Sequence, residues 1–178
     1  MERKTAQAFA VWITGLPASG KSTLARALEA QLAARGVDAA VLESDALRKV
    51  LSDHPSYDER ERDTFYRVMT YIGVVLTEHG VPVIFDATAN LRLYRERARQ
   101  QIARFLEVYV ECPLESCMAR DPKGIYSQAR EGAASSVPGV QAPYEPPQTP
   151  DVVVHSGQEA PEPAAARVLA KLAEKSYL

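Results

Sequence analysis

The sequence predicts an α/β fold in which a mostly parallel sheet carries helices on both faces. Short apolar runs alternate along the chain with longer segments whose apolar residues recur at helical spacing. Glycines stand where several of these segments are expected to end, at Gly15, Gly36 and Gly80. The 178 residues suffice for one domain with one sizeable core, so we expect a single domain over residues 1–178.

The first four expected elements alternate between strand and helix. Residues 8–14 form an apolar run stopped by a glycine, which is typical of a buried strand. Residues 21–35 carry leucines and alanines at helical spacing, and residues 37–43 are expected to form a second strand. A short helix is expected over residues 45–51, with Ser44 as its N-cap.

The middle of the chain is expected to contain a long helix, a third strand and a charged helix. The long helix covers residues 59–79, the strand residues 81–85 and the charged amphipathic helix residues 91–104. The apolar face expected of the long helix comprises Phe65, Val68, Met69, Ile72, Val75 and Leu76.

The last part of the chain is expected to add two strands and two helices around an irregular segment. Residues 105–111 and 152–154 are expected strands, and residues 114–119 and 161–177 are expected helices. Residues 121–150 are rich in Gly, Pro, Ser and Ala, and a stretch of this length without a clear element is either functional or disordered. In a sheet of this kind, ligands bind at the carboxyl ends of the strands.

One motif indicates which ligand the protein binds. Its residues are Gly15, Leu16, Pro17, Ala18, Ser19, Gly20, Lys21 and Ser22, followed by Thr23. They fit G-x-x-x-x-G-K-[ST] between an expected strand and an expected helix, where backbone N–H groups and the helix dipole face phosphate oxygens. Lys21 is then expected to neutralise the β- and γ-phosphates of ATP, and Ser22 to be a ligand of Mg²⁺. The sequence therefore predicts a P-loop NTPase fold, nucleoside-monophosphate-kinase-like, that binds ATP and Mg²⁺ and passes a phosphoryl group to a small acceptor.

The bulk composition argues against several kinds of partner. The net charge of −2 is unlike that of a general nucleic-acid binder. No apolar run approaches the roughly 18 residues of a membrane span. Cys112 and Cys117 have no metal-site spacing, and we expect reduced structural thiols in a cytoplasmic protein. We therefore expect a small-molecule substrate, with neither nucleic acid nor membrane as a partner.

Four segments beyond the phosphate loop carry a further resemblance. They are residues 45–48 (Asp-Ala-Leu-Arg), 105–114, 117–126 with Arg-Asp-Pro-Lys-Gly-Ile-Tyr, and 139–147 with Pro-Tyr-Glu-Pro-Pro. On these segments the chain resembles the adenylylsulfate (APS) kinase family, which phosphorylates the 3′-hydroxyl of APS to give PAPS in sulfate activation. The resemblance implies the same reaction here, and because members of the family often form dimers, it also suggests a homodimer.

The resemblance implies roles for residues near the strand ends. Asp45 is expected to take the proton of the acceptor hydroxyl or to orient Mg²⁺, with a helix-start residue as the alternative. Arg48 lies one turn later on the same face and can fork onto a phosphate or sulfate of the substrate. Arg62 and Arg67 match arginines of the family, and we expect substrate contacts from them rather than a solvated charged face.

The irregular residues 121–150 match the family's lid, which closes over the nucleotides and keeps water from the γ-phosphoryl group. Arg120 is expected to lie near ATP and Lys123 near the substrate. Tyr57 matches one aromatic wall of the substrate adenine pocket, and Val137 stands where the family has a phenylalanine as the other wall.

The chain departs from the family pattern around the acceptor. Ala46 and Phe65 replace asparagines, and Val137 would forfeit about 1–3 kcal/mol of base stacking. Ala89 replaces a serine described as a phosphorylated intermediate, so we expect direct in-line transfer. Asp86 is new relative to the pattern and is expected to help hold Mg²⁺ through water, with a strand-end turn residue as the alternative.

Three functional hypotheses stay open at this point. The first is an APS kinase, and the second is a kinase of the same architecture that phosphorylates another hydroxyl, such as a modified nucleotide or sugar. The altered acceptor pocket supports the second. The third is a nucleotide-binding regulatory or assembly domain, and the intact set of Lys21, Ser22, Asp45 and Lys123 argues against it.

Overall fold

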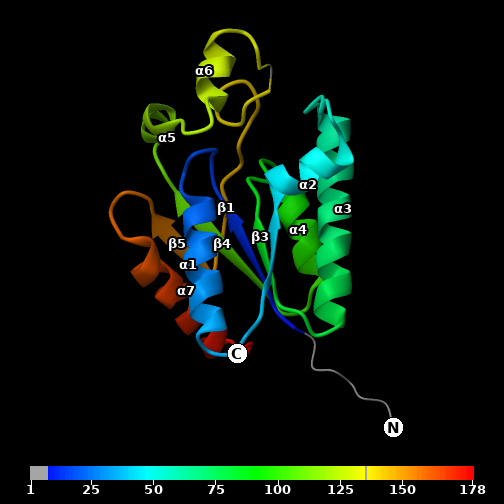
Figure 1. The fold of residues 1–178 in the computed structure, drawn as a ribbon, viewed down its shortest axis with the longest axis vertical. Coiled ribbons are helices and arrows are strands. Elements are labelled where there is room, and N and C mark those ends of the chain that lie inside the picture. The colour runs from blue at the N-terminus through cyan, green and yellow to red at the C-terminus, as the bar shows by residue number, and fades with distance from the viewer. Residues whose placement is uncertain (1–7, 135) are drawn as a thin grey trace.

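The computed structural model describes residues 8–134 and 136–178, which form a five-stranded parallel sheet with helices on both sides (Figure 1). The strands are β1 (Ala10–Thr14), β2 (Ala40–Glu43), β3 (Val83–Asp86), β4 (Phe105–Glu111) and β5 (Val152–His155). The helices are α1 (Lys21–Ala33), α2 (Ser44–Leu51), α3 (Glu59–Glu78), α4 (Arg92–Gln101), α5 (Leu114–Arg120), α6 (Ile125–Arg130) and α7 (Pro161–Glu174). None of the described helices is both long and apolar enough to cross a membrane. The predicted α/β class with a parallel sheet is confirmed.

The strand order brings the ends of three strands to one place. The order is β2-β3-β1-β4-β5, and each neighbouring pair is parallel. Asp86 at the end of β3 pairs in register with Ile13 of β1 on one side and Glu43 of β2 on the other. Whatever follows these three strands therefore lies at the same edge of the sheet.

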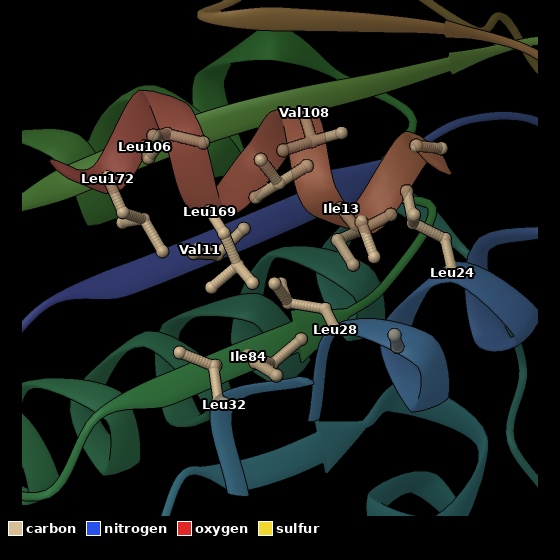
Figure 2. Close-up of a cluster of buried hydrophobic side chains, with 14 of the residues drawn as sticks. Val11, Ile13, Leu24, Leu28, Leu32, Ile84, Leu106, Val108, Leu169 and Leu172 are labelled. Carbon is tan, nitrogen blue, oxygen red and sulfur yellow. The ribbon is translucent and has the colours of Figure 1, made fainter. Parts of the chain in front are cut away.

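Alternate residues of the central strand β1 serve the two faces of the sheet. Val11 and Ile13 pack under α1 and α7 with Leu28 and Leu169, and all four side chains are buried (Figure 2). This face is the larger apolar cluster of the sheet, and it fixes α1 directly behind the phosphate loop. A helix start held by so much buried surface gives the loop a rigid support.

The opposite face of the sheet is aromatic. Trp12 stacks on Phe85 with 4.5 Å between the ring centroids, and Tyr66 stacks on Tyr94 at 4.7 Å. Trp12 and Phe85 come from the sheet, Tyr66 from α3 and Tyr94 from α4, and all four residues are buried. The Trp12 indole N–H donates to the carbonyl oxygen of Ala87 at 3.2 Å, which ties this core to the chain that leaves β3.

Two details of α2 and α3 differ from the sequence prediction. Helix α2 begins at Ser44 itself, and Glu43 occupies the N-cap position without a side-chain cap hydrogen bond, so the N-cap prediction was wrong. Val75, predicted to lie on the buried face of α3, is 36% exposed. The helix instead turns Gly73 toward the sheet. It approaches the Phe85 ring so closely that a Cβ at this position would lie 2.2 Å from it.

The segment 121–150, for which no regular element was expected, contains α6. Asp121 caps this helix by accepting from the backbone N–H groups of Tyr126 at 3.1 Å and Ser127 at 2.8 Å. The Tyr126 hydroxyl donates to the Pro17 carbonyl oxygen at 2.9 Å. The side-chain cap and the burial of Tyr126 stabilise a short helix that apolar periodicity does not reveal. Helices α5 and α6 lie beyond the end of the sheet to which β1 leads (Figure 1).

Candidate active site

A cavity of about 810 Å³ opens at the carboxyl end of the sheet. It is bounded by the loop after β1, by α2, by the chain before α3, by the end of β3 and by the segment from Arg120 to Pro138. Its volume is at the upper end of ordinary ligand pockets. The fold therefore gathers into one cavity segments that lie far apart in the sequence.

The loop after β1 forms one wall of the cavity. Its residues on this wall are Pro17, Ala18, Gly20, Lys21, Ser22 and Thr23. Gly15 permits the tight turn, because a Cβ there would lie 2.6 Å from the carbonyl oxygen of Val110. Gly20 is the N-cap of α1 with φ of 105°, a conformation that glycine adopts without strain. The first N–H groups of α1 have no intrahelical partner and are available to an anion here.

Lys21 is the buried cation of this wall. It is 8% exposed, and its Nζ donates to the Leu16 carbonyl oxygen at 2.8 Å. Burial lowers the pKa of Lys21 to about 8, while the nearby charges of Asp86 and Asp45 oppose that shift. An ammonium in such a site interacts with phosphate more strongly than one in water does.

The residues around the loop fit a magnesium nucleotide. The loop turns so tightly that a Cβ at Gly15 would lie 2.7 Å from Ser19 Oγ. Ser22 and Asp86 line the same cavity and offer hard oxygen ligands, which Mg²⁺ prefers. Asp86 is only 6% exposed and stands at the end of the strand beside β1, on the Lys21 side of the site.

Asp45 and Lys123 both line the cavity and contact each other. Lys123 Nζ forms an ion pair with Asp45 Oδ2, and the two side chains are 59% and 57% exposed respectively. The hydrogen bond to Asp45 raises the pKa of Lys123 above its usual value. The pair joins the start of α2 to the segment between α5 and α6, so the predicted lid reaches the predicted catalytic carboxylate.

The far wall of the cavity carries Arg48, Tyr57 and Arg62. The Arg48 side chain is 9% exposed and forms an ion pair with Glu61. Arg62 is 7% exposed, and its Nε donates to the Tyr57 carbonyl oxygen at 2.8 Å. Burial lowers the pKa of Arg62. Arg62 Nη2 also donates to the Ser136 carbonyl oxygen, so one guanidinium connects this wall to the lid segment.

Comparison with known proteins assigns the part of the chain that lines the cavity to one family. Residues 7–155 match the family model described as adenylylsulphate kinase. The chain belongs to the adenylylsulphate kinase family. Adenylyl-sulfate kinases of Microcystis aeruginosa and of a Synechococcus strain are 40% and 38% identical to it over 94% of this chain, covering 93% and 96% of their own lengths.

A solved structure of the family has the same fold. The Mycobacterium tuberculosis APS kinase in complex with AMPPNP and APS is similar with a TM-score of 0.88 and 32% identity. The match covers 94% of this chain and 98% of that one. The P-loop NTPase fold and the family resemblance predicted from the motifs are both confirmed.

Arg67 and Val137, both expected at the family's substrate pocket, differ in their relation to the cavity. Arg67 is exposed and does not line the cavity, because five residues along α3 turn it about 140° away from Arg62. Of the two arginines expected to contact the substrate, only Arg62 lines the cavity in this structure. Val137 lines the cavity but is only 5% exposed, since its side chain packs with Cys117 and Tyr126. Burial raises the pKa of Cys117 to about 12, as expected of an inert structural thiol.

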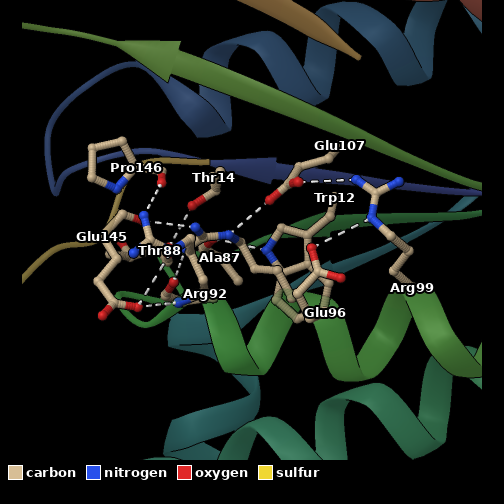
Figure 3. A network of polar contacts seen from close by, with 12 residues as sticks. Trp12, Thr14, Ala87, Thr88, Arg92, Glu96, Arg99, Glu107, Glu145 and Pro146 are labelled. Atoms are coloured by element: carbon tan, nitrogen blue, oxygen red, sulfur yellow. Dashed lines mark hydrogen bonds and ion pairs between the residues drawn. The ribbon is translucent and has the colours of Figure 1, made fainter. Parts of the chain in front are cut away.

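A buried polar network fixes the chain that follows β3 (Figure 3). Arg95 donates to Glu107 Oε1 at 2.8 Å, to the Ala89 carbonyl oxygen and to the Glu145 carbonyl oxygen at 2.6 Å. Thr14 donates to the Thr88 carbonyl oxygen at 2.6 Å. The Pro-Tyr-Glu segment is thus tied to the loop that follows Asp86. Sequence analysis missed this hub because a charged helix gives no sign that one arginine is 1% exposed.

Glu61, which the sequence analysis did not single out, does not line the cavity itself but pairs with Arg48, which does. Asp58 Oδ1 accepts from the Glu61 N–H at 2.8 Å, so the two residues occupy the N-cap and N3 positions of α3. The pattern Asp-x-x-Glu at a helix start was the signal available in the sequence. Tyr66 and Thr88 also line the cavity and had no local signal.

Proposed function

We propose that this chain is an APS kinase that transfers the γ-phosphoryl group of ATP to the 3′-hydroxyl of APS. The observation that carries the proposal is that, in a chain of this family, the phosphate loop and the Asp45–Lys123 pair both line one cavity. One wall suits a triphosphate and the other a hydroxyl acceptor.

ATP is proposed to lie along the phosphate loop. The backbone of residues 15–23 cradles the phosphates, and Lys21 neutralises the oxygens that gain charge as the bond to the leaving group breaks. Ser22 and Asp86 are proposed to hold Mg²⁺, directly or through water, and the ion would neutralise charge on the β- and γ-phosphates. Arg120 donates to Ser156 Oγ at 2.7 Å at the rim of the loop, where we propose that it contacts the nucleotide.

Asp45 is proposed to act on the acceptor hydroxyl. The 3′-oxygen of APS forms a bond to the γ-phosphorus, the bond from that phosphorus to the β–γ bridging oxygen breaks, and ADP leaves. The proton of the hydroxyl passes to the carboxylate of Asp45. Lys123, which pairs with Asp45, is positioned to stabilise the anionic groups that meet there.

The remaining residues of the far wall are proposed to bind APS. Tyr57 offers an aromatic surface to the adenine, while Arg48 and Arg62 supply positive charge beside its phosphosulfate. Val137 is proposed to close the pocket as an apolar contact rather than as a stacking wall. The segment 121–150 covers the reacting groups and excludes water.

The proposal is tested by measuring PAPS formation by the purified chain with ATP–Mg²⁺ over a range of APS concentrations. A panel of nucleosides, nucleotides and sugars replaces APS in parallel reactions. Turnover that saturates at micromolar APS, with little transfer to the panel, is the expected result. Tight ATP binding with no PAPS, or faster transfer to a member of the panel, would leave a phosphate-loop kinase with another acceptor.

We further propose that the chain works as one kinase domain in the cytoplasm and pairs as a homodimer. The described cysteines are free thiols, which fits a reducing compartment. The dimer rests on the family resemblance, and sedimentation of the purified chain measures it.

A further inference from the structure

Tyr57 has an unusual backbone conformation at the wall of the cavity. Its φ is 56°, in the left-handed region that residues with a side chain rarely adopt. Its side chain lines the cavity, and the residue remains 43% exposed. Strain of this kind persists only where surrounding contacts hold it, and such residues cluster at functional sites.

Polar contacts hold the backbone of Tyr57 from both sides. Its N–H donates to Glu61 Oε2 at 2.8 Å. Its carbonyl oxygen accepts from Arg62 Nε at 2.8 Å and from Ser136 Oγ at 3.2 Å. Both peptide groups of the strained residue are therefore fixed, one of them by a residue of the lid segment.

The ring of Tyr57 is supported as well. The Arg48 guanidinium carbon lies 4.8 Å from the Tyr57 ring centroid and 3.8 Å from that of Phe65. Phe65 is 3% exposed, so the guanidinium links a core ring to a ring in the cavity. The other carboxylate oxygen of Glu61 forms the ion pair with Arg48. Glu61 thus holds the backbone of Tyr57 with one oxygen and the cation over its ring with the other.

We propose that Glu61 is a positioning residue for acceptor binding. It holds Tyr57 and Arg48 in the arrangement that receives the planar group of the acceptor. The proposal rests on the proposed function only in taking that planar group to be a purine. An exposed aromatic face in a binding cavity stacks on a base without needing hydrogen bonds to it. A ring held in advance does so at a lower entropic cost than a mobile one.

The test uses adenosine as the probe and the full chain saturated with AMPPNP, so that the ATP side is filled. Adenosine carries no charge, so its affinity reports stacking and not attraction between Arg48 and an anion. Tyr57→Leu is expected to raise the Kd of adenosine by about 5- to 150-fold. Glu61→Ala is expected to raise it at least fivefold, with the Kd of AMPPNP changed less than twofold.

A double-mutant cycle separates positioning from an independent role. Adding Glu61→Ala to Tyr57→Leu should change the Kd of adenosine less than twofold further, because both changes remove the same surface. Glu59→Ala is the matched control, an exposed acidic residue in the same first turn of α3, and should leave the Kd unchanged. The proposal would be overturned if the fold-increases in Kd of the two single variants multiplied in the double variant. It would also be overturned if the Glu61→Ala protein bound adenosine as wild type does.

A second variant covers the case in which loss of Glu61 unfolds the start of α3. Glu61→Gln keeps an oxygen for the Tyr57 N–H but loses the charge that holds Arg48. Its Kd for adenosine should rise about two- to fivefold with an unchanged melting temperature, and an unchanged Kd would contradict the proposal. So would a wild-type complex that does not bind adenosine. PAPS formation by wild type is recorded separately, so failure of the proposed function shows as binding without turnover.

Discussion

The two walls of the cavity are built in opposite ways. The phosphate wall is one continuous stretch, residues 15–23, whose shape comes from backbone turns and whose one cation, Lys21, is 8% exposed. The acceptor wall is assembled from α2, the chain before α3, the first part of α3 and the lid, and its chemistry rests on side chains. Its central pair, Asp45 and Lys123, is more than half exposed. A backbone-built wall binds phosphates in any member of the fold, whereas a side-chain-built wall can be altered one residue at a time.

The largest effect is expected on the phosphate wall. Lys21→Ala should lower kcat by at least about a thousandfold, because it removes the charge that stabilises the transferring phosphoryl group. Circular dichroism and the melting temperature check that the fold is kept. A variant with more than a tenth of wild-type turnover would break the assignment of this wall.

A smaller but selective effect is expected at Asp45. Asp45→Asn should lower kcat by about 100- to 10,000-fold, since it removes the proposed base, while the Kd of ATP changes less than threefold. Steady-state kinetics with a parallel ATP titration measure both. Asp86→Asn is the comparison, and it should weaken binding of ATP–Mg²⁺ as well. If Asp45→Asn keeps full turnover, Asp86 becomes the leading carboxylate.

The two arginines of α3 should behave differently. Arg62→Ala should raise the KM for APS by about 10- to 100-fold, the range for losing hydrogen bonds to a charged group, with an unchanged Kd for ATP. Arg67→Ala should change neither by more than twofold, because Arg67 lies outside the cavity. Equal losses in the two variants would refute the placement of Arg67.

The burial of Lys21 predicts a pH dependence of ATP binding. The pKa of about 8 means that the free protein loses this charge as pH rises through 8, whereas bound phosphates keep it protonated. The Kd of ATP should therefore be flat below pH 8 and rise by up to about tenfold per pH unit above it. Calorimetric titrations across pH 7–9.5 measure this, and Lys21→Met should abolish the rise. A flat profile in wild type would show that the ammonium is not desolvated.

The smallest effect is expected at Val137. Because its side chain packs against Cys117 and Tyr126, Val137→Phe should lower the free energy of unfolding by about 1–3 kcal/mol through overpacking. The KM for APS should change less than fivefold. Urea denaturation and steady-state kinetics measure the two quantities. Unchanged stability with a much lower KM would mean that the new ring enters the cavity opposite Tyr57.

The same contrast explains what the sequence could predict. The strands, most of the helix bounds and the phosphate wall follow from apolar periodicity and a contiguous motif, which depend on neighbours in the chain. The departures lie where distant segments meet. Gly73 rather than Val75 faces the sheet, where it lies close against Phe85, and Asp121 accepts from the Ser127 N–H in the first turn of α6.

On the acceptor wall the sequence indicated residue types but not their partners. Asp45, Arg48, Tyr57, Arg62 and Lys123 do line the cavity. Nothing local revealed that Lys123 pairs with Asp45 or that Arg48 lies over Phe65. Those contacts require the tertiary structure, because they join residues from different elements.

The most direct test of the account is the position of the transferred phosphate. Wild-type protein is incubated with ATP–Mg²⁺ and APS, and the product is assigned by ³¹P NMR, with 3′-deoxy-APS as the matched control. The account predicts a new phosphomonoester on the 3′-oxygen of APS and no transfer to the deoxy compound. Phosphate on another atom, or equal turnover of the deoxy compound, would contradict the claim that these two walls bring the γ-phosphoryl group and the 3′-hydroxyl together.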